Sequence, residues 1–309
     1  MSLSGLVSLH TERIDAAVRT WGHMLADTPS WDHPCHFFDA TEETVRWIFT
    51  LDVLNHCFWP DRGEPAWTVR YGGSDWSGYW GLAASLKRAI EWKIPITDPA
   101  WLSGLTENDL ARVFSGEGQI PLFTQRLMNL REAGSIILSE CGGDILSLVA
   151  DASGSAVRLV KEVAALFPSF RDQAVYKGRT VYLWKRAQIF AADVHAAFGG
   201  RRFGAFSDVE MLTAFADYKL PQVLRELGII SYDPELSAAI DNMVFIDPGS
   251  EAEVEIRAAT IVSVEEIRKR FHYGGLTVTS ARVDGWLWQL GQMDIFRKRP
   301  YHRCRTVFY

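Results

Sequence analysis

FADYKLPQ, residues Phe215 to Gln222, places one carboxylate among aromatic and aliphatic neighbours. The proline four residues after Asp217 fixes the backbone near the start of the next helix. A charge in apolar surroundings is costly unless it is paired or hydrogen-bonded. Asp217 is therefore expected to cap a helix, to pair with a buried cation or to bind a ligand.

Other charged or polar side chains also interrupt apolar runs. They are Asp52 with Asn55, Lys185 with Arg186, Glu255 with Arg257, and Asp284 before Trp286-Leu287-Trp288. Because isolated ions in such places are costly, we expect these groups to meet in space, as a structural network or as a polar cleft. A cleft that mixes acids and bases suits an anionic sugar phosphate that carries a hydrogen-bonding base. Glu255 and Arg257 are also close enough along the chain to share a local partner.

The composition is that of an ordinary globular protein. The chain has 309 residues, of which 48% are hydrophobic and 23% are charged, and its net charge is -6. We find no repeats or flexible linker, so we expect one domain spanning residues 1–309. The negative balance disfavours a nucleic-acid polymer as a partner, so a bound nucleotide is expected to be small.

Common site motifs are missing from the sequence. The four cysteines form no C-x-x-C pair, and His33 and His36 are spaced poorly for a metal on one helix face, so we expect neither a metal nor another cofactor. Gly199, Gly200 and Gly204 do not form a phosphate-binding fingerprint, and no nucleophile-elbow serine is present. Without a signal peptide or a long apolar run, the chain is expected to be cytoplasmic and away from membranes. A monomer is favoured, with the oligomeric state left open.

Hydrophobic periodicity predicts a mostly α-helical fold with a minor β-hairpin component. The expected helices cover residues 6–25, 41–59, 79–92, 122–140, 145–167, 185–198, 208–215, 221–227, 234–243, 251–272 and 283–294. Alternation in 67–71 followed by Gly72-Gly73 predicts a hairpin with residues 75–77, and a second hairpin is expected at 174–183 around Lys177-Gly178. Twelve tryptophans are many for this length; most are expected in the core, and some could stack on a planar base. Phe215 is either a stacking residue of this kind or a core aromatic.

Eight stretches, taken together, resemble the queuosine-salvage family, whose members act as queuosine 5'-phosphate N-glycosylases. These are VLNHCFWP (53–60), SGYWGLAASLKRA (77–89) with IPITDP after it, LFPSFRD (166–172), YLWKRAQI (182–189), FADYKLPQVLRELG (215–228), EVEIRAATIVSVE (253–265), VDGWLW (283–288) and PYHRCRTVFY (300–309). No single stretch is a general chemical motif, but the ordered set covers nearly the whole chain.

The resemblance implies hydrolysis of queuosine 5'-monophosphate, which frees queuine for reinsertion into tRNA. It also implies a helical fold similar to that of helix-hairpin-helix DNA glycosylases, where a catalytic aspartate begins a helix after a short aliphatic lead. Val283-Asp284-Gly285 looks like that lead and aspartate. The usual hairpin glycine signature of those enzymes is not evident in this sequence.

Cleavage of a nucleoside bond builds positive charge on the ribose, which an ionised carboxylate stabilises. On the resemblance we assign this role to Asp284 and the guanine-like edge of the base to Asp217. Phe215 is expected to stack on the ring, with Tyr218 close by and His33 at the periphery of the base. The predicted phosphate and hydroxyl contacts come from Lys185, Arg186, Arg303, Arg305, Tyr79 and Tyr309.

Three alternatives remain open on the sequence alone. The two aspartates could exchange roles. The same aromatic slot and acids would also serve a non-catalytic carrier of queuine or its nucleotide. A nucleic-acid glycosylase is disfavoured by the negative charge and the absence of a basic stripe.

Overall fold

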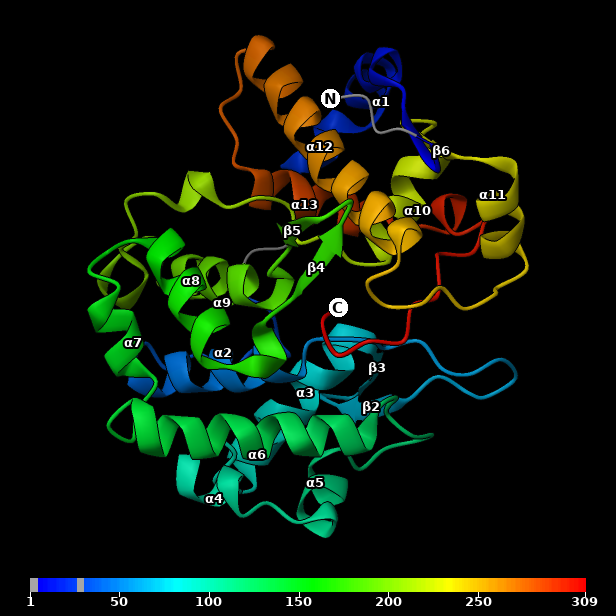
Figure 1. The fold of residues 1–309 in the computed structure, drawn as a ribbon. Helices are drawn as coiled ribbons and strands as arrows, with labels where there is room; N and C mark the ends of the chain where they lie inside the picture. Colours follow the sequence, from blue (N-terminus) through cyan, green and yellow to red (C-terminus); the bar gives the residue numbers. More distant parts are fainter. Residues whose placement is uncertain (1–4, 27–30) are drawn as a thin grey trace.

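The structure, a computed structural model, describes residues 5–26 and 31–309 and is mostly α-helical, as predicted (Figure 1). The helices are α1 (Ile14–Trp21), α2 (Glu42–Leu54), α3 (Gly78–Glu91), α4 (Pro99–Ser103), α5 (Glu107–Val113), α6 (Phe123–Glu140), α7 (Leu146–Asp151), α8 (Ala156–Leu166), α9 (Lys185–Ala197), α10 (Lys219–Glu226), α11 (Pro234–Asp241), α12 (Glu251–Tyr273) and α13 (Ser280–Leu290). The strands are β1 (Val7–Leu9), β2 (Thr68–Tyr71), β3 (Ser74–Ser77), β4 (Gln173–Tyr176), β5 (Arg179–Tyr182) and β6 (Ile230–Tyr232). Within the described ranges, no helix is long and apolar enough to cross a membrane.

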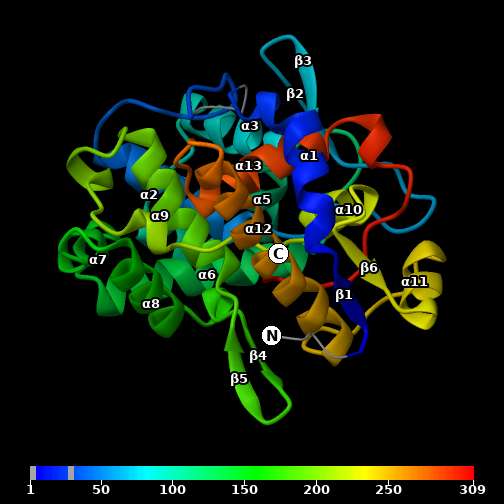
Figure 2. The same ribbon diagram turned by 90° about the horizontal axis from the view of Figure 1, so that it is seen from above.

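Both predicted hairpins are confirmed. Strands β2 and β3 pair antiparallel around Gly72 and Gly73, which adopt φ values of 58° and 82°. Positive φ at both central residues is what a tight hairpin turn requires, and glycine reaches it without a steric penalty. Strands β4 and β5 pair in the same way. Figure 2 shows the two hairpins projecting from opposite sides of the molecule.

The helix predicted at residues 6–25 is wrong in its first part. Val7–Leu9 forms β1, which pairs antiparallel with β6 far along the chain, and the α-helix begins only at Ile14. Pairing with β6 buries Val7 completely and satisfies the backbone of both segments. Since this partner lies more than 200 residues away, local periodicity does not reveal it.

Two further helix predictions are corrected by the structure. The segment 145–167 is split into α7 and α8, because Ser153 and Gly154 adopt φ values of 52° and 77° and Ser155 then caps α8. Residues 208–215 form only a 3-10 turn at Val209–Met211 followed by extended chain. The carboxylate of Asp208 accepts hydrogen bonds from Ser155 and from the backbone of Ala156, so it caps α8 instead of beginning a helix of its own.

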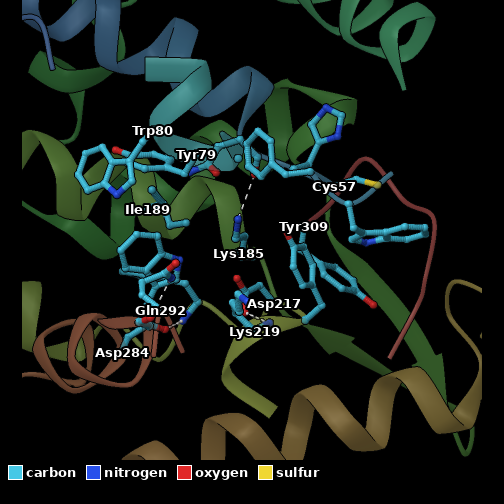
Figure 3. Close-up of a pocket in the computed structure, with 18 of the residues that line it drawn as sticks. Cys57, Tyr79, Trp80, Lys185, Ile189, Asp217, Lys219, Asp284, Gln292 and Tyr309 are labelled. Atoms are coloured by element: carbon cyan, nitrogen blue, oxygen red, sulfur yellow. Dashed lines mark hydrogen bonds between the residues drawn. The ribbon is translucent and has the colours of Figure 1, made fainter. Parts of the chain in front are cut away.

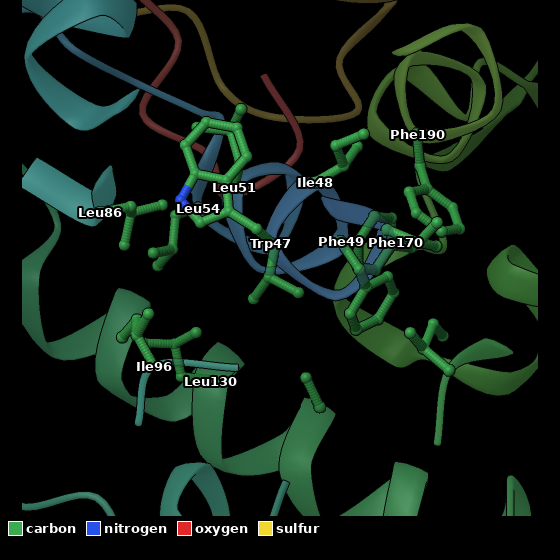
Figure 4. Packing of buried hydrophobic residues seen from close by; sticks show 14 of the residues in the cluster. Trp47, Ile48, Phe49, Leu51, Leu54, Leu86, Ile96, Leu130, Phe170 and Phe190 are labelled. Carbon is green, nitrogen blue, oxygen red and sulfur yellow. The ribbon is translucent and has the colours of Figure 1, made fainter. Parts of the chain in front are cut away.

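Two hydrophobic clusters make up the interior. The first is built on α2, α3, α6, α8 and α9, with Trp47, Phe49, Phe170 and Phe190 among its large side chains (Figure 4). The second joins α1, α10, α12, α13, β1 and β6. In Figure 1 the helices of the second cluster lie above α2, α3 and α6, with the C-terminal segment between the two groups.

Candidate active site

A cavity of about 490 Å³ lies where the two hydrophobic clusters meet (Figure 3). Its wall is drawn from the end of α2, the start of α3, one face of α9, the segment 215–219, α13 and the last residues of the chain. The volume falls in the range that suits a small-molecule ligand. Because both clusters contribute to the wall, residues far apart in the sequence converge here.

The structure brings most of the sequence-predicted site residues to this cavity. Its lining includes Tyr79, Lys185, Phe215, Asp217, Tyr218, Asp284 and Tyr309. Four others, His33, Arg186, Arg303 and Arg305, do not line it.

His33 lies behind the cavity wall. Its ring stacks on Trp80 with the ring centroids 3.5 Å apart, and its Nδ1 accepts a hydrogen bond from the backbone of Cys35. Burial lowers the pKa of His33, with a smaller effect from the charge of Lys87. His36, which the sequence offered only as part of a metal pattern, does line the cavity, as does His56.

The three arginines hold backbone and aromatic groups in place. Arg186 is buried and donates to the carbonyl oxygens of Asp52, Val53 and Ser169. Arg303 and Arg305 both cover the ring of Trp59, at 5.2 and 4.8 Å from its centroid, and Arg305 also pairs with Asp61. Trp59 itself lines the cavity, so these two arginines support the wall from outside.

Asp217 caps helix α10 and also lines the cavity. Its Oδ1 accepts hydrogen bonds from the backbone N–H groups of Lys219 at 2.7 Å and Leu220 at 3.0 Å. Burial raises the pKa of Asp217, while the charge of Lys185 and these two hydrogen bonds oppose the rise. The cap and the ligand-binding role considered above are compatible, since both bonds use one oxygen.

Asp284 is the fifth residue of α13, because Thr279 caps the helix and starts it three residues before the predicted Val283. Its Oδ2 accepts a hydrogen bond of 2.7 Å from the backbone of Phe215. Burial, and then the neighbouring charge of Asp217, raise the pKa of Asp284 to about 8. Near neutral pH the free site therefore holds a neutral carboxyl group at this position.

Lys185 is the central cation of the site. It is the first residue of α9, its backbone N–H donates to Asp172, and its Nζ donates to the carbonyl oxygen of Asn55 at 3.0 Å. Burial lowers the pKa of Lys185, whereas its charge opposes the raised pKa values of Asp217 and Asp284. The Lys185 ammonium group thus favours the ionised form of both Asp217 and Asp284.

The charged and polar residues that the sequence predicted to meet do so only in part. Asp52, Asn55, Lys185 and Arg186 do meet. Arg257 pairs with Asp172 at 2.6 Å and with Glu253 at 3.0 Å. Glu255 instead accepts hydrogen bonds from the hydroxyl of Tyr176 and the backbone of Leu6, so it shares no partner with Arg257.

Arg257 connects three parts of the cavity wall. It donates to the carbonyl oxygen of Ala216 between Phe215 and Asp217, and its guanidinium lies 4.1 Å from the ring centroid of Tyr309. Its partner Asp172 holds the backbone of Lys185. The ion pair is buried and lies outside the lining, so it positions site residues without reaching the cavity.

Several lining residues were not predicted from the sequence to bind a ligand. Lys219 and Arg297 bring two further cations, and the charge of Arg297 adds to burial in lowering the pKa of Lys219. Asp193 brings a third carboxylate, and Trp80 and Trp288 bring aromatic faces. The spacing of Lys185, Ile189 and Asp193 by four residues was the available signal for Asp193, because this spacing repeats one face of a helix.

Sequence similarity to known proteins covers most of the chain. Residues 35–309 match a family model described as "Queuosine salvage protein". A protein of Sphaerobacter thermophilus named "Queuosine 5'-phosphate N-glycosylase/hydrolase" is 47% identical over 91% of this chain and 86% of its own length. Proteins with the same name from Nematostella vectensis and Mus musculus are 36% and 34% identical, covering 90% and 87% of this chain and 85% and 83% of their own lengths.

Proposed function

This chain belongs to the queuosine salvage protein family, and we propose that it hydrolyses the N-glycosidic bond of queuosine 5'-phosphate to release queuine. The observation that carries the proposal is the convergence of Asp217 and Asp284 on one cavity beside Lys185. These acids are separated by 67 residues in the chain, and the cavity they share has room for a nucleotide. A fold that buries two carboxylates in this way has a destabilising cost, which ligand binding and catalysis explain.

In the proposed mechanism Asp284 faces the ribose. The bond between C1' and the base nitrogen breaks, water supplies the oxygen that bonds to C1', and one water proton goes to the departing base. Positive charge on the ribose is greatest in the transition state, where a carboxylate lowers the barrier most. Because the pKa of Asp284 is raised to about 8, this group must lose its proton to act as a carboxylate, and the developing positive charge favours that loss.

Asp217 and Phe215 hold the base in this proposal. Queuine is a 7-deazapurine without the N7 lone pair, so its departure depends on hydrogen bonds elsewhere on the ring. The guanine-like edge presents donors, and the Asp217 carboxylate accepts them. Phe215 lies two residues earlier, and its backbone N–H binds Asp284, so base-binding and ribose-facing groups are held by one short segment.

We assign the 5'-phosphate to Lys219 and Arg297. Both line the cavity, and no ion pair joins either of them to a carboxylate in the described part of the chain. The charge of Arg297 lowers the pKa of Lys219, so the two cations are near enough to repel each other, and a bound anion would offset that repulsion. Lys185 is the third cation of the lining, but its ammonium group already interacts electrostatically with Asp217 and Asp284.

The proposal is tested by incubating the protein with queuosine 5'-phosphate and measuring free queuine by mass spectrometry over time. The expected result is product that accumulates far beyond one equivalent of protein, with D284N as the inactive control. A non-catalytic carrier, the alternative raised by the sequence, would bind the nucleotide and give no time-dependent product.

A further inference from the structure

Asp193 is a carboxylate of the cavity that the proposed mechanism does not use. It lies two turns beyond Lys185 on the same face of α9, with Ile189 between them. No hydrogen bond or ion pair among residues 5–26 and 31–309 engages its side chain. Burial raises the pKa of Asp193 to about 7, opposed by the charge of Lys185. An acid that lines a cavity without a partner is suited to a ligand that supplies one.

The hydroxyl of Tyr79 is a hydrogen-bond acceptor at the same end of the cavity. His36 bonds through Nδ1 to the carbonyl oxygen of Trp31 and through Nε2 to the Tyr79 hydroxyl, both at 2.8 Å. Burial lowers the pKa of His36 to about 4, so the ring is neutral. Since a carbonyl only accepts, Nδ1 carries the proton and Nε2 accepts from Tyr79. The Tyr79 oxygen has therefore already used its proton, and only its lone pairs remain for a ligand.

Asp193 and Tyr79 are close enough to interact electrostatically. After burial, the charge of Asp193 is the largest influence that raises the pKa of Tyr79, followed by that of Asp52. Asp52 is fully buried, and its Oδ2 has no hydrogen-bond partner in the described structure. Burial raises the pKa of Asp52 well above its usual range. Asp193 is therefore the acid at this end that a bound cation would ionise, beside the lone pairs of Tyr79.

Aromatic faces border the same end. Trp80 contacts Tyr79 edge to face at 5.0 Å and Trp288 at 6.0 Å between ring centroids, and all three line the cavity. Indole faces attract cations. Figure 3 shows Tyr79, Trp80 and Ile189 on one side of the cavity and Lys219 on the other.

We propose that Asp193 and Tyr79 form a subsite for a protonated amine, and that it binds the cationic side arm of the queuine base. The assignment of the arm rests on the proposed function. Asp193 accepts a charge-assisted hydrogen bond from the ammonium group, the Tyr79 oxygen accepts a second one, and the indoles cover its apolar flank. The cavity then has an acceptor end for the amine and a cationic end, at Lys219 and Arg297, for the phosphate.

The test measures binding of two free bases by isothermal titration calorimetry. Queuine carries the amine, and 7-deazaguanine is the same bicyclic base without the side arm. D193N is expected to weaken queuine binding by about 10- to 100-fold, as loss of a charge-assisted hydrogen bond implies, and to leave 7-deazaguanine binding within about 2-fold. Y79F is expected to weaken queuine binding by about 3- to 10-fold, again without an effect on 7-deazaguanine.

The matched control is D151N, which removes an exposed carboxylate at the end of α7 and is expected to change neither affinity. The subsite is disproved if D193N and Y79F leave queuine binding unchanged, or if they weaken both bases equally, because either result places the amine elsewhere. Y79F keeps the test decisive if D193N does not fold. A wild-type protein that binds neither base overturns the proposed function, and this inference with it.

Discussion

The backbone N–H of Phe215 donates a 2.7 Å hydrogen bond to the carboxylate of Asp284. This bond ties the segment that carries Phe215 and Asp217 to helix α13. A shift of either element would move the base-binding and ribose-facing groups together. The first experiments should therefore separate the chemistry of each acid from its structural bonds.

D284N is expected to lower kcat by at least about 10³-fold, because it removes a charge that acts chiefly in the transition state. The asparagine oxygen still accepts from Phe215, so queuine binding should change by less than about 3-fold. Steady-state release of queuine at saturating substrate measures the first quantity and calorimetry the second. Strong loss of queuine binding with preserved turnover would reverse the roles assigned to the two aspartates.

D217N is expected to weaken queuine binding by about 10-fold or more, since a carboxylate is a stronger acceptor than an amide. Asparagine keeps the cap on α10, so the free energy of unfolding should change little. D217A removes the cap as well and should cost about 1 kcal/mol of stability. If D217N and D217A weaken binding only in proportion to lost stability, Asp217 is a structural residue.

The raised pKa of Asp284 predicts a pH-dependent stability difference. Between pH of about 4 and 8 the folded protein keeps a proton on Asp284 that the unfolded chain releases. This group therefore makes the free energy of unfolding fall as pH rises through that window. As pH rises through this window, the free energy of unfolding of D284N, measured in urea, should increase relative to that of the wild type by up to about 1.4 kcal/mol per pH unit. A constant difference from pH 5 to 8, like that expected for D151N, would contradict the assignment.

The same pKa governs activity. If Asp284 acts as a carboxylate, kcat/KM should rise with pH up to about 8 and then level off. A fall in kcat/KM over this range would mean that the neutral carboxyl group is the active form. The pH profile of initial queuine release, recorded with substrate well below KM, distinguishes the two.

Lys219 and Arg297 are expected to set the preference for the phosphorylated substrate. K219M and R297Q should each raise KM for queuosine 5'-phosphate by about 10-fold or more and leave queuine binding unchanged, because the free base has no phosphate. R158Q is the matched control, since Arg158 is exposed on α8 and pairs with Glu162 away from the cavity. Equal effects from R158Q and R297Q would argue against the proposed phosphate site.

The ion pair between Asp172 and Arg257 should couple stability to ligand binding. D172N leaves a buried guanidinium poorly compensated and is expected to lower the free energy of unfolding by about 3 kcal/mol or more. It also loosens the contacts to Ala216 and Lys185, so queuine binding should weaken although Asp172 does not line the cavity. R257K retains the charge, but lysine lacks the bidentate geometry of arginine. R257K should therefore also have a lower free energy of unfolding and weaker queuine binding than the wild type.

Local chemistry made much of the fold predictable from the sequence. Thr41 with Glu42 and Glu43 marks the start of α2, and the side chain of Thr41 accepts from the backbone of Glu43 in the structure. Short helices were missed, although α5 carries a capping box between Thr106 and Asp109 that the sequence contains. Pairing of β1 with β6 was beyond reach, because both strands are three residues long and depend on a distant partner.

The residues of the site were also only partly predictable from the sequence. Asp217 and Asp284 stand out in sequence as acids inside apolar runs, and both line the cavity. Lys219 and Arg297 lie in segments that look like an ordinary helix start and a basic tail. Their common cavity depends on how α10 and the chain after α13 pack. Arg186 and Arg303 looked equally promising, but their cationic groups contact backbone oxygens or the ring of Trp59 instead.

The tryptophans around the cavity give the protein a built-in optical signal. Trp31, Trp59, Trp80 and Trp288 belong to its wall, on segments that come from both hydrophobic clusters. A planar base that enters between them would alter their emission, so intrinsic fluorescence could follow occupancy in real time without a label. Exchanging Trp80 or Trp288 for phenylalanine, one at a time, would reveal which ring reports the arrival of the ligand.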